Sequence, residues 1–247
     1  MIFDIDGTLV DTAGLHNRLI GDVLARDGLD LAFKPAAAYA HYTDYCVLDD
    51  LYRHNHGRPV SASDLSRYDA LYAEALEAWL PGNPLREIAG ARTLLKDLAA
   101  RDDVIVAFAT GSLRAMARIK LAFLEVDADR AVLATGSEHL TREAIVHDAA
   151  MQAEARFGEA CRVVILGDGP WDQRTAQNLA LAFVAIESGT HRFGKGPVAV
   201  QSDYIGFGAE TLIGHASPID GFRRRAAALR NPNRHIETED SLPGRFP

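Results

Sequence analysis

Short runs of apolar residues, each followed by glycine or polar residues, are the clearest pattern along the chain. Runs of this length with such boundaries predict buried strands. Five strands are predicted, at residues 1–5, 104–109, 131–134, 162–166 and 182–186. Apolar positions at helical spacing predict helices at 90–101, 113–124 and 141–156. Because strands and helices alternate, we expect an α/β fold, with a parallel sheet covered by helices on both faces.

The stretch between the first two strands follows helical spacing instead. Helices are predicted there at 16–25, 43–53 and 64–79. An insert of roughly 70 residues is too long for a simple connection, so we interpret it as a small all-helical cap domain inserted after the first strand. Residues 12–82 would form this cap, and residues 1–11 and 83–220 the core. Residues 221–247 would form a tail that is partly helical or loose.

Composition limits the classes of function and partner. The formal net charge is -8, which disfavours a nucleic-acid partner because phosphate backbones are bound mainly by excess Lys and Arg. The chain has no apolar run long enough for a signal peptide or a membrane span, so we expect no membrane partner. Cys46 and Cys161 lack metal-ligand spacing, which indicates two reduced thiols and a cytoplasmic protein. The sequence does not decide the oligomeric state, for which monomer and homodimer are the two alternatives.

Two acids lie at alternate positions where the first strand ends. Asp4 and Asp6 would point the same way along an extended chain, and Gly7 lets the chain turn sharply. Neighbouring carboxylates attract a hard cation such as Mg2+. With a phosphate ester present, one can attack phosphorus while the other moves a proton to and from the leaving group. The alternative is an Asp-rich turn after a strand.

A hydroxyl-rich turn follows the second strand. Thr110, Gly111 and Ser112 precede a helix, where hydroxyl and backbone N–H groups can bind a phosphate. An ordinary helix cap is the alternative interpretation. Residues 135–137 repeat the same Thr-Gly-Ser sequence but are less favoured, because no helix follows them at once.

A phosphate and several acids need a balancing cation. Arg142 opens the helix after the third strand, and its guanidinium suits bidentate phosphate contact. Lys120 is the competing candidate. Its position in the preceding helix indicates a solvated residue on the helix face, so Arg142 is preferred.

Two further acids follow the fourth strand. Asp168 comes directly after four apolar residues and a glycine, and Asp172 lies four positions on. Asp168 can ligate a metal directly, whereas Asp172 can bind it through water or orient a ligand. Several strand ends with compatible chemistry, in this order, favour one shared site.

The chain resembles the haloacid dehalogenase-like (HAD) superfamily in four motifs: Asp4-x-Asp6-Gly7-Thr8, Thr110 with Ser112, Arg142, and Asp168-x-x-x-Asp172. The resemblance covers roughly residues 1–190 and implies a Rossmann-like core. The insert resembles the helical cap of the phosphoglycolate-phosphatase and β-phosphoglucomutase branch. One departure is Ala180, which stands where that family usually has Gly after the fourth motif.

The resemblance also implies roles for these residues. Mg2+ would be bound by Asp4, the backbone carbonyl of Asp6 and Asp168, with Asp172 in the same site. An aspartyl-phosphate would form on Asp4, and Asp6 would act as general acid and then as general base. Thr8 would join the turn after the second strand in contacting the phosphate.

The cap is expected to contact the substrate and to exclude water. His16, Thr43 and Asp44 are the candidates, because His16 lies one helical turn from Thr12 and the other two lie in a polar break between helices. A satisfied interface histidine and a helix cap are the respective alternatives.

We therefore expect a Mg2+-dependent phosphatase acting on a small phosphorylated metabolite. A phosphosugar mutase on the same machinery is the alternative, and a catalytically silent binding or regulatory protein is less favoured. Asp6 disfavours a dehalogenase, since the dehalogenases of the superfamily lack this second acid. Lys34, the only lysine of the insert, precedes Pro35 in a loop and makes phosphonate cleavage through a Schiff base a weak hypothesis.

Overall fold

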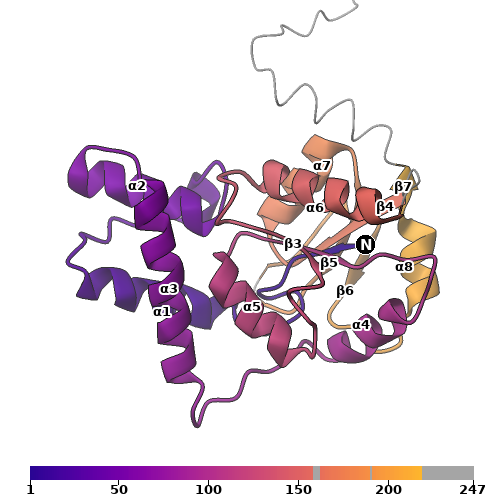
Figure 1. The fold of residues 1–247 in the computed structure, drawn as a ribbon. Coiled ribbons are helices and arrows are strands. Elements are labelled where there is room, and N and C mark those ends of the chain that lie inside the picture. The colour runs from indigo at the N-terminus through magenta and orange to yellow at the C-terminus, as the bar shows by residue number, and fades with distance from the viewer. Residues whose placement is uncertain (158–161, 190, 219–247) are drawn as a thin grey trace, which may run out of the picture.

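The core of the protein is a mostly parallel sheet (Figure 1). The computed structural model describes residues 1–157, 162–189 and 191–218, and within these ranges the sheet has seven strands. They are β1 (Ile2–Phe3), β2 (Ala107–Thr110), β3 (Val132–Thr135), β4 (Arg162–Gly167), β5 (Ala182–Ile186), β6 (Ala199–Gln201) and β7 (Ser217–Pro218). The order is β3-β2-β1-β4-β5-β6, with β7 antiparallel to β4. Since β1 lies between β2 and β4, the carboxyl ends of these three strands meet at one edge.

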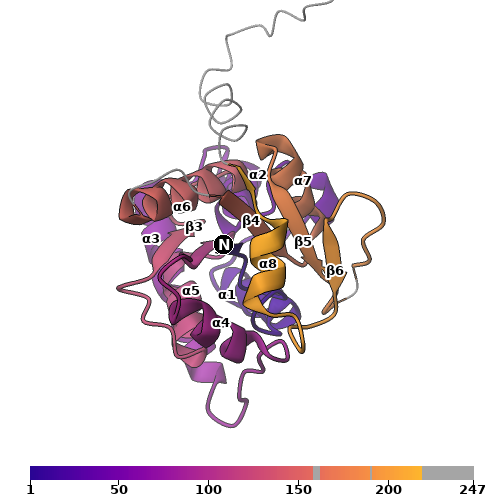
Figure 2. The ribbon, with the colours of Figure 1, turned by 90° about the vertical axis from the view of Figure 1, so that its right-hand side faces the viewer.

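Helices cover both faces of the sheet (Figures 1 and 2). They are α4 (Ala91–Ala99), α5 (Arg114–Phe123) and α8 (Ala209–His215) on one face, and α6 (Arg142–Phe157) and α7 (Pro170–Leu179) on the other. Adjacent strand residues point to opposite faces. Phe3 therefore packs in one apolar cluster with Leu94 and Leu121, whereas Ile2 packs in the other with Ile145.

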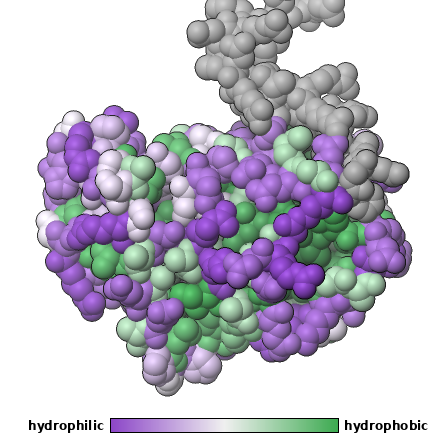
Figure 3. All heavy atoms as spheres, in the orientation of Figure 1, coloured by the Kyte–Doolittle hydropathy of each residue, from purple (hydrophilic) through white to green (hydrophobic). Residues whose placement is uncertain are grey.

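Three helices between β1 and α4 form a layer of their own at the left of Figure 1. They are α1 (Ala13–Arg26), α2 (Asp44–His56) and α3 (Ala62–Trp79), with a short 3-10 turn at Ala36–Ala38. Tyr68 and Tyr72 of α3 are fully buried and anchor this layer. Side chains fix the helix starts, since Ser61 and Asp64 form a capping box at α3. On the face in Figure 3, polar residues cover most of this layer, and apolar residues show between them over the core.

The predicted α/β fold with a parallel sheet is confirmed. The five strands and six helices occur, most of them with shifted ends, and β5 has the predicted bounds. The sequence predicts a first strand that reaches residue 5, but β1 ends at Phe3 because the chain turns there: Leu9 and Val10 N–H both donate to the Ile5 carbonyl. Strand β2 begins at Ala107 rather than at residue 104. Strands β6 and β7 and helices α7 and α8 are not among the elements predicted from the sequence pattern.

The structure tests only some of the predictions on domain boundaries, the C-terminal tail, the two cysteines and membrane spans. The boundaries of the cap domain, at residues 12 and 82, stay a prediction. The tail at 221–247 and Cys161 lie outside the described residues, while Cys46 is a free thiol. Among the helices of the described ranges, none combines the length and apolarity that a bilayer crossing requires.

Helix α7 ends at a strained residue. Ala180 adopts the left-handed conformation, with φ 55°, where glycine is the usual residue. We predict that Ala180→Gly raises the free energy of unfolding by roughly 0.5–1 kcal/mol, because relief of the strain exceeds the entropy that glycine adds to the unfolded chain. Urea denaturation measures the change.

Helix α4 provides the matched control. The residue that caps its C-terminus, Ala100, has φ -80°, where alanine is unstrained. Ala100→Gly should lower the free energy of unfolding by roughly 0.5–1 kcal/mol. Equal destabilisation by both substitutions would contradict the strain at Ala180.

Candidate active site

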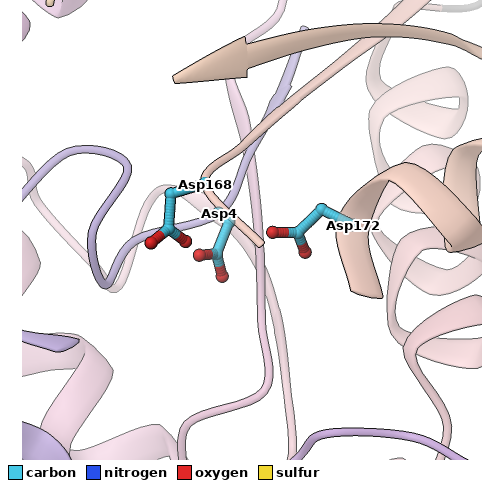
Figure 4. A group of neighbouring side chains, drawn as sticks. All are labelled: Asp4, Asp168 and Asp172. Atoms are coloured by element: carbon cyan, nitrogen blue, oxygen red, sulfur yellow. The ribbon is translucent and has the colours of Figure 1, made fainter. Parts of the chain in front are cut away.

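Three carboxylates meet at the carboxyl ends of β1 and β4 (Figure 4). Asp4 follows β1, Asp168 follows β4, and Asp172 points toward them from the first turn of α7. One oxygen of each lies within 4.8 Å of the others, and all three residues are buried. This edge of the sheet is where α/β folds bind ligands.

The three acids repel one another. Burial and the charge of Asp172 raise the pKa of Asp4 to about 7. Burial and the charges of Asp4 and Asp172 raise the pKa of Asp168 to about 9. Burial also raises the pKa of Asp172. A cluster of this kind destabilises its own ionised form and attracts a positive charge.

Two glycines make room for these acids. A Cβ atom at Gly7 would lie 2.1 Å from Asp168 Oδ2, and Gly7 has φ +76°, so both space and conformation require glycine there. A Cβ atom at Gly167 would lie 2.5 Å from the carboxylate of Asp172. Gly7 of the first motif therefore leaves the space that the side chain of Asp168 in the fourth motif occupies.

Arg142, the first residue of α6, faces the three acids. Its Nη1 lies 2.8 Å from Asp172 Oδ1 and 3.4 Å from Asp4 Oδ1. Its Nε donates to the backbone carbonyl of Tyr42 at 3.1 Å. Although burial opposes the charged form, Asp172 and Asp4 raise the pKa of Arg142. Arg142 thus lies where the predicted balancing cation is needed.

The prediction that Lys120 is a solvated helix-face residue is wrong. Its side chain is 1% exposed, and its Nζ lies 2.6 Å from Asp6 Oδ1 and 3.1 Å from His16 Nδ1. The pattern along α5 cannot reveal this burial, because the covering residue His16 comes from α1, about a hundred residues earlier in the chain. Lys120 therefore belongs to the site, but it binds Asp6 and not the three acids.

Asp6 is held by several polar partners besides Lys120. Ser112 Oγ donates to its Oδ2 at 2.6 Å, and Thr12 Oγ1 donates to its Oδ1 at 2.5 Å. Although burial alone would raise it, the charges of Lys120 and His16 hold the pKa of Asp6 well below its ordinary value. Asp6 is therefore an ionised carboxylate with both oxygens engaged.

The insert brings His16, Thr43 and Asp44 to the same site. His16 Nε2 lies 2.8 Å from Asp44 Oδ1, so His16 is a satisfied interface histidine. Thr43 Oγ1 accepts from Cys46 N–H as the cap of α2 and donates to the Leu140 carbonyl at 2.9 Å. His16 and Thr43 therefore have the structural roles that the sequence offered as alternatives, an interface histidine and a helix cap. Both also line the cavity.

The N-terminus of α5, expected to bind phosphate, is already capped by acids of the insert. Leu113 N–H donates to Asp44 Oδ2 at 2.9 Å, and Ala115 N–H donates to Asp69 Oδ1 at 2.7 Å. No sequence motif marks Asp69, which reaches α5 only because α3 packs there. Residues 110–112 still line the cavity and can contact a ligand.

A cavity of about 600 Å³ joins the carboxylates to the insert. The predicted site residues that line it are Asp4, Asp6, His16, Thr43, Asp44, Thr110, Gly111, Ser112, Arg142 and Asp168. Thr8 and Asp172 lie behind the lining: the Thr8 hydroxyl donates to Asp4 Oδ2 at 3.3 Å, and Asp172 binds Arg142. Residues 135–137, the alternative turn, are not among the lining residues. Sequence reasoning also missed lining residues such as Tyr42 and Trp171.

The donor set suits a hard divalent cation. Asp168 Oδ1 is buried and has no hydrogen-bond partner among the described residues, so a cation or a proton must satisfy it. The clustered donors are carboxylate oxygens, which Mg2+ prefers. Both oxygens of Asp172 are engaged, by Arg142 and by the Gly169 N–H at 3.1 Å. Asp4 and Asp168 therefore fit direct Mg2+ ligation best.

The sequence and the fold both have known relatives. A sequence profile described as haloacid dehalogenase-like hydrolase matches residues 1–177. Among curated proteins, no sequence matches this chain. A hydrolase from Pseudomonas syringae has a similar structure, with 22% identity, a TM-score of 0.63, and coverage of 83% of this chain and 95% of its own.

CbbY from Rhodobacter sphaeroides, solved in complex with phosphate, is also similar. It has 20% identity, a TM-score of 0.66, and coverage of 85% of this chain and 97% of its own. A point variant of CbbY in complex with xylulose-1,5-bisphosphate has 18% identity and a TM-score of 0.58, with the same coverage of 85% and 97%. At such identities these likenesses show the fold.

Removal of one repelling acid should stabilise the metal-free protein. We predict that Asp168→Asn raises the melting temperature in EDTA by about 3–6 °C, equivalent to roughly 1–2 kcal/mol. The gain should be larger at pH 8 than at pH 5. The reason is that an unfolded Asp ionises near about pH 4, whereas folded Asp168 stays protonated up to about 9. Stability of the parent protein therefore falls as pH rises through this window, and Asn escapes the loss.

Thermal melts with and without Mg2+ test this prediction. Mg2+ should raise the melting temperature of the parent protein more than that of the variant. Asp97→Asn, at an exposed site on α4, is the control and should change neither value. A lower melting temperature for metal-free Asp168→Asn would contradict the repulsion among the three acids.

Proposed function

The chain belongs to the haloacid dehalogenase-like hydrolase family, and from this premise we propose that it is a Mg2+-dependent phosphatase. Its substrate is a small phosphorylated metabolite, and its nucleophile is Asp4. The observation that supports this most directly is Asp4 itself, buried in the cavity beside Asp168 and Arg142. The complexes of CbbY with phosphate and with xylulose-1,5-bisphosphate agree with a phosphate-ester substrate.

In the first step, a carboxylate oxygen of Asp4 bonds to phosphorus while the bond from phosphorus to the ester oxygen breaks. The product is an aspartyl-phosphate. Arg142, 3.4 Å from Asp4, can bind the non-bridging oxygens. Thr110 and Ser112 offer hydroxyl groups from the end of β2.

Asp6 moves the protons. It donates one to the departing oxygen and, as the carboxylate, takes one from the water that attacks the aspartyl-phosphate and releases inorganic phosphate. In the present arrangement Asp6 is ionised and bound by Lys120 and Ser112. The acid role therefore requires Asp6 to take up a proton first and to exchange these contacts for the ester oxygen.

Asp4 and Asp168 would hold the metal ion, together with the backbone carbonyl of Asp6. When bound, Mg2+ would neutralise negative charge on the phosphoryl oxygens. Asp172 orients the guanidinium of Arg142, 2.8 Å away, toward the same position.

A phosphosugar mutase is the second candidate. The lining by His16, Thr43 and Asp44 from the insert favours it, since a mutase must exclude water from its aspartyl-phosphate. A mutase also binds a second phosphate group. Among the described residues, two basic side chains of Lys or Arg line the cavity, Arg142 and Lys34. Lys34 already pairs with Asp50 and is not free to bind a second phosphate.

The same pairing disfavours phosphonate cleavage. The hydrogen bond to Asp50 raises the pKa of Lys34 and keeps its amine protonated. Formation of a Schiff base needs the neutral amine. The pairing of Lys34 with Asp50 thus leaves a mutase without a second free cation and phosphonate cleavage without a neutral amine.

We predict that Asp4→Asn lowers phosphate release by roughly 10³-fold or more, because the amide cannot attack phosphorus. Phosphate release from a panel of phosphorylated metabolites measures this, with Asp22→Asn on the exposed face of α1 as the control. The variant should melt at or above the parent temperature in EDTA. Near-parent turnover by folded Asp4→Asn would rule out Asp4 as the nucleophile.

We also predict that chelation with EDTA silences the enzyme and that added Mg2+ restores it, because the cluster of acids repels phosphate without a cation. The same assay with glucose 1-phosphate separates the two candidate functions. A phosphatase releases inorganic phosphate, and a mutase forms glucose 6-phosphate. Activity that is indifferent to EDTA would remove the metal from the mechanism.

A further inference from the structure

Aromatic rings form one side of the cavity. We call the row Tyr39, Tyr42, Trp171 and His191 the aromatic wall, and all four side chains line the cavity. Successive ring centroids are separated by 6.0 Å, 4.6 Å and 5.4 Å. Tyr39 and Tyr42 come from the insert and the other two from the core, so both parts of the chain build the wall.

The aromatic wall begins beside the phosphate end of the site. The guanidinium carbon of Arg142 lies 5.7 Å from the centre of the Trp171 ring, and the same side chain binds Asp4 and Asp172. A phosphate that contacts both Asp4 and Arg142 would therefore lie close to Trp171, so that its leaving group can reach the rings of Trp171 and Tyr42.

The backbone around Tyr42 fixes this wall relative to the acids. The carbonyl of Tyr42 accepts from Arg142 Nε at 3.1 Å. Asp44 N–H donates to the Gly111 carbonyl at 2.9 Å, and Thr43 Oγ1 donates to the Leu140 carbonyl at 2.9 Å. These bonds hold the ring in place before any ligand binds, which lowers the entropic cost of binding against it.

Several polar groups near the aromatic wall are already paired within the protein, whereas the indole Nε1 of Trp171 is buried without a hydrogen-bond partner among the described residues. Asp11 binds Arg86 at 2.9 Å, and the amide oxygen of Asn17 accepts from the Tyr42 hydroxyl at 3.3 Å. Both oxygens of Asp44 are engaged as well. A sugar is recognised through hydrogen bonds to its hydroxyl groups, and a bisphosphate needs a second free cation. The lining suits neither well.

Aromatic faces instead favour a flat ring, through stacking and apolar burial. We propose that the substrate is a phosphate monoester whose leaving group carries an aromatic ring, such as a nucleobase or a pyridine. This inference rests on the phosphatase function proposed above and narrows its substrate class. A volume of about 600 Å³ accommodates a ligand of this size.

Four esters of primary alcohols test the inference, because their reacting groups match and their ring systems differ. Uridine 5′-monophosphate and pyridoxal 5′-phosphate carry aromatic rings, whereas ribose 5-phosphate and glucose 6-phosphate do not. At least one ring ester should have a kcat/KM more than tenfold above both sugar phosphates, and the better of the two identifies the ring as nucleobase or pyridine. Sugar phosphates that equal or exceed both ring esters overturn the inference and leave the phosphatase function standing. If none of the four, nor acetyl phosphate, is turned over, both proposals fall.

Substitutions in the wall test its role directly. Tyr42→Leu and Trp171→Leu should each lower kcat/KM for the preferred ring ester roughly threefold to tenfold, mainly through KM, the range expected for one aromatic pair. The loss for ribose 5-phosphate should be much smaller. Tyr42→Phe keeps the ring and should retain activity on the ring ester.

Tyr45→Leu is the matched control. Tyr45 lies three residues beyond Tyr42 but does not line the cavity, so loss of its ring should change neither substrate's kinetics. Melting temperatures of all variants identify any that are misfolded. Equal losses for ring ester and ribose 5-phosphate in folded Tyr42→Leu would show that the ring only supports the structure, and would overturn the inference.

Discussion

Repulsion among three buried carboxylates is the constraint on which the rest of this structure depends. Asp4, Asp168 and Asp172 approach within 4.8 Å in a place that water hardly reaches. Ionised acids cannot share such a place unless a positive charge joins them. Arg142 supplies part of that charge, and the unpaired oxygen of Asp168 leaves room for a cation to supply the remainder. The parallel sheet makes the approach geometrically possible, since β1 and β4 are neighbours and end at the same edge.

The helical insert completes the site and does more than cover it. Asp44 and Asp69 cap the N-terminus of α5, His16 contacts Lys120, and Lys120 in turn binds Asp6. A displacement of the insert would therefore uncap α5 and remove His16 from Lys120 at the same time. This couples the position of the insert to the surroundings of the residue proposed to move protons. The dense polar contacts between insert and core explain why the cap residues foreseen from sequence have structural as well as site roles.

The sequence alone predicted that the acids at the strand ends converge, but it did not predict the contacts of several residues around them. Asp4, Asp168 and Arg142 follow strand ends or open helices, and such positions converge in any parallel sheet, so their convergence could be foreseen. Lys120 and Asp69 lie within helices and have no local signal. Their roles arise from contacts with residues 104 and 46 positions away. The aromatic wall was invisible for the same reason, because Tyr42 and Trp171 meet only through the folded chain.

The sequence by itself determined the alternation of strands and helices, the helical insert after the first strand, and the acids at the strand ends. These depend on periodicity and on nearest neighbours, which a linear pattern records. Only the tertiary structure decided that Arg142 and not Lys120 faces the three acids, that insert carboxylates cap α5, and that aromatic rings line the cavity beside Arg142. Those outcomes depend on which surfaces pack together, and packing is set by the whole chain at once.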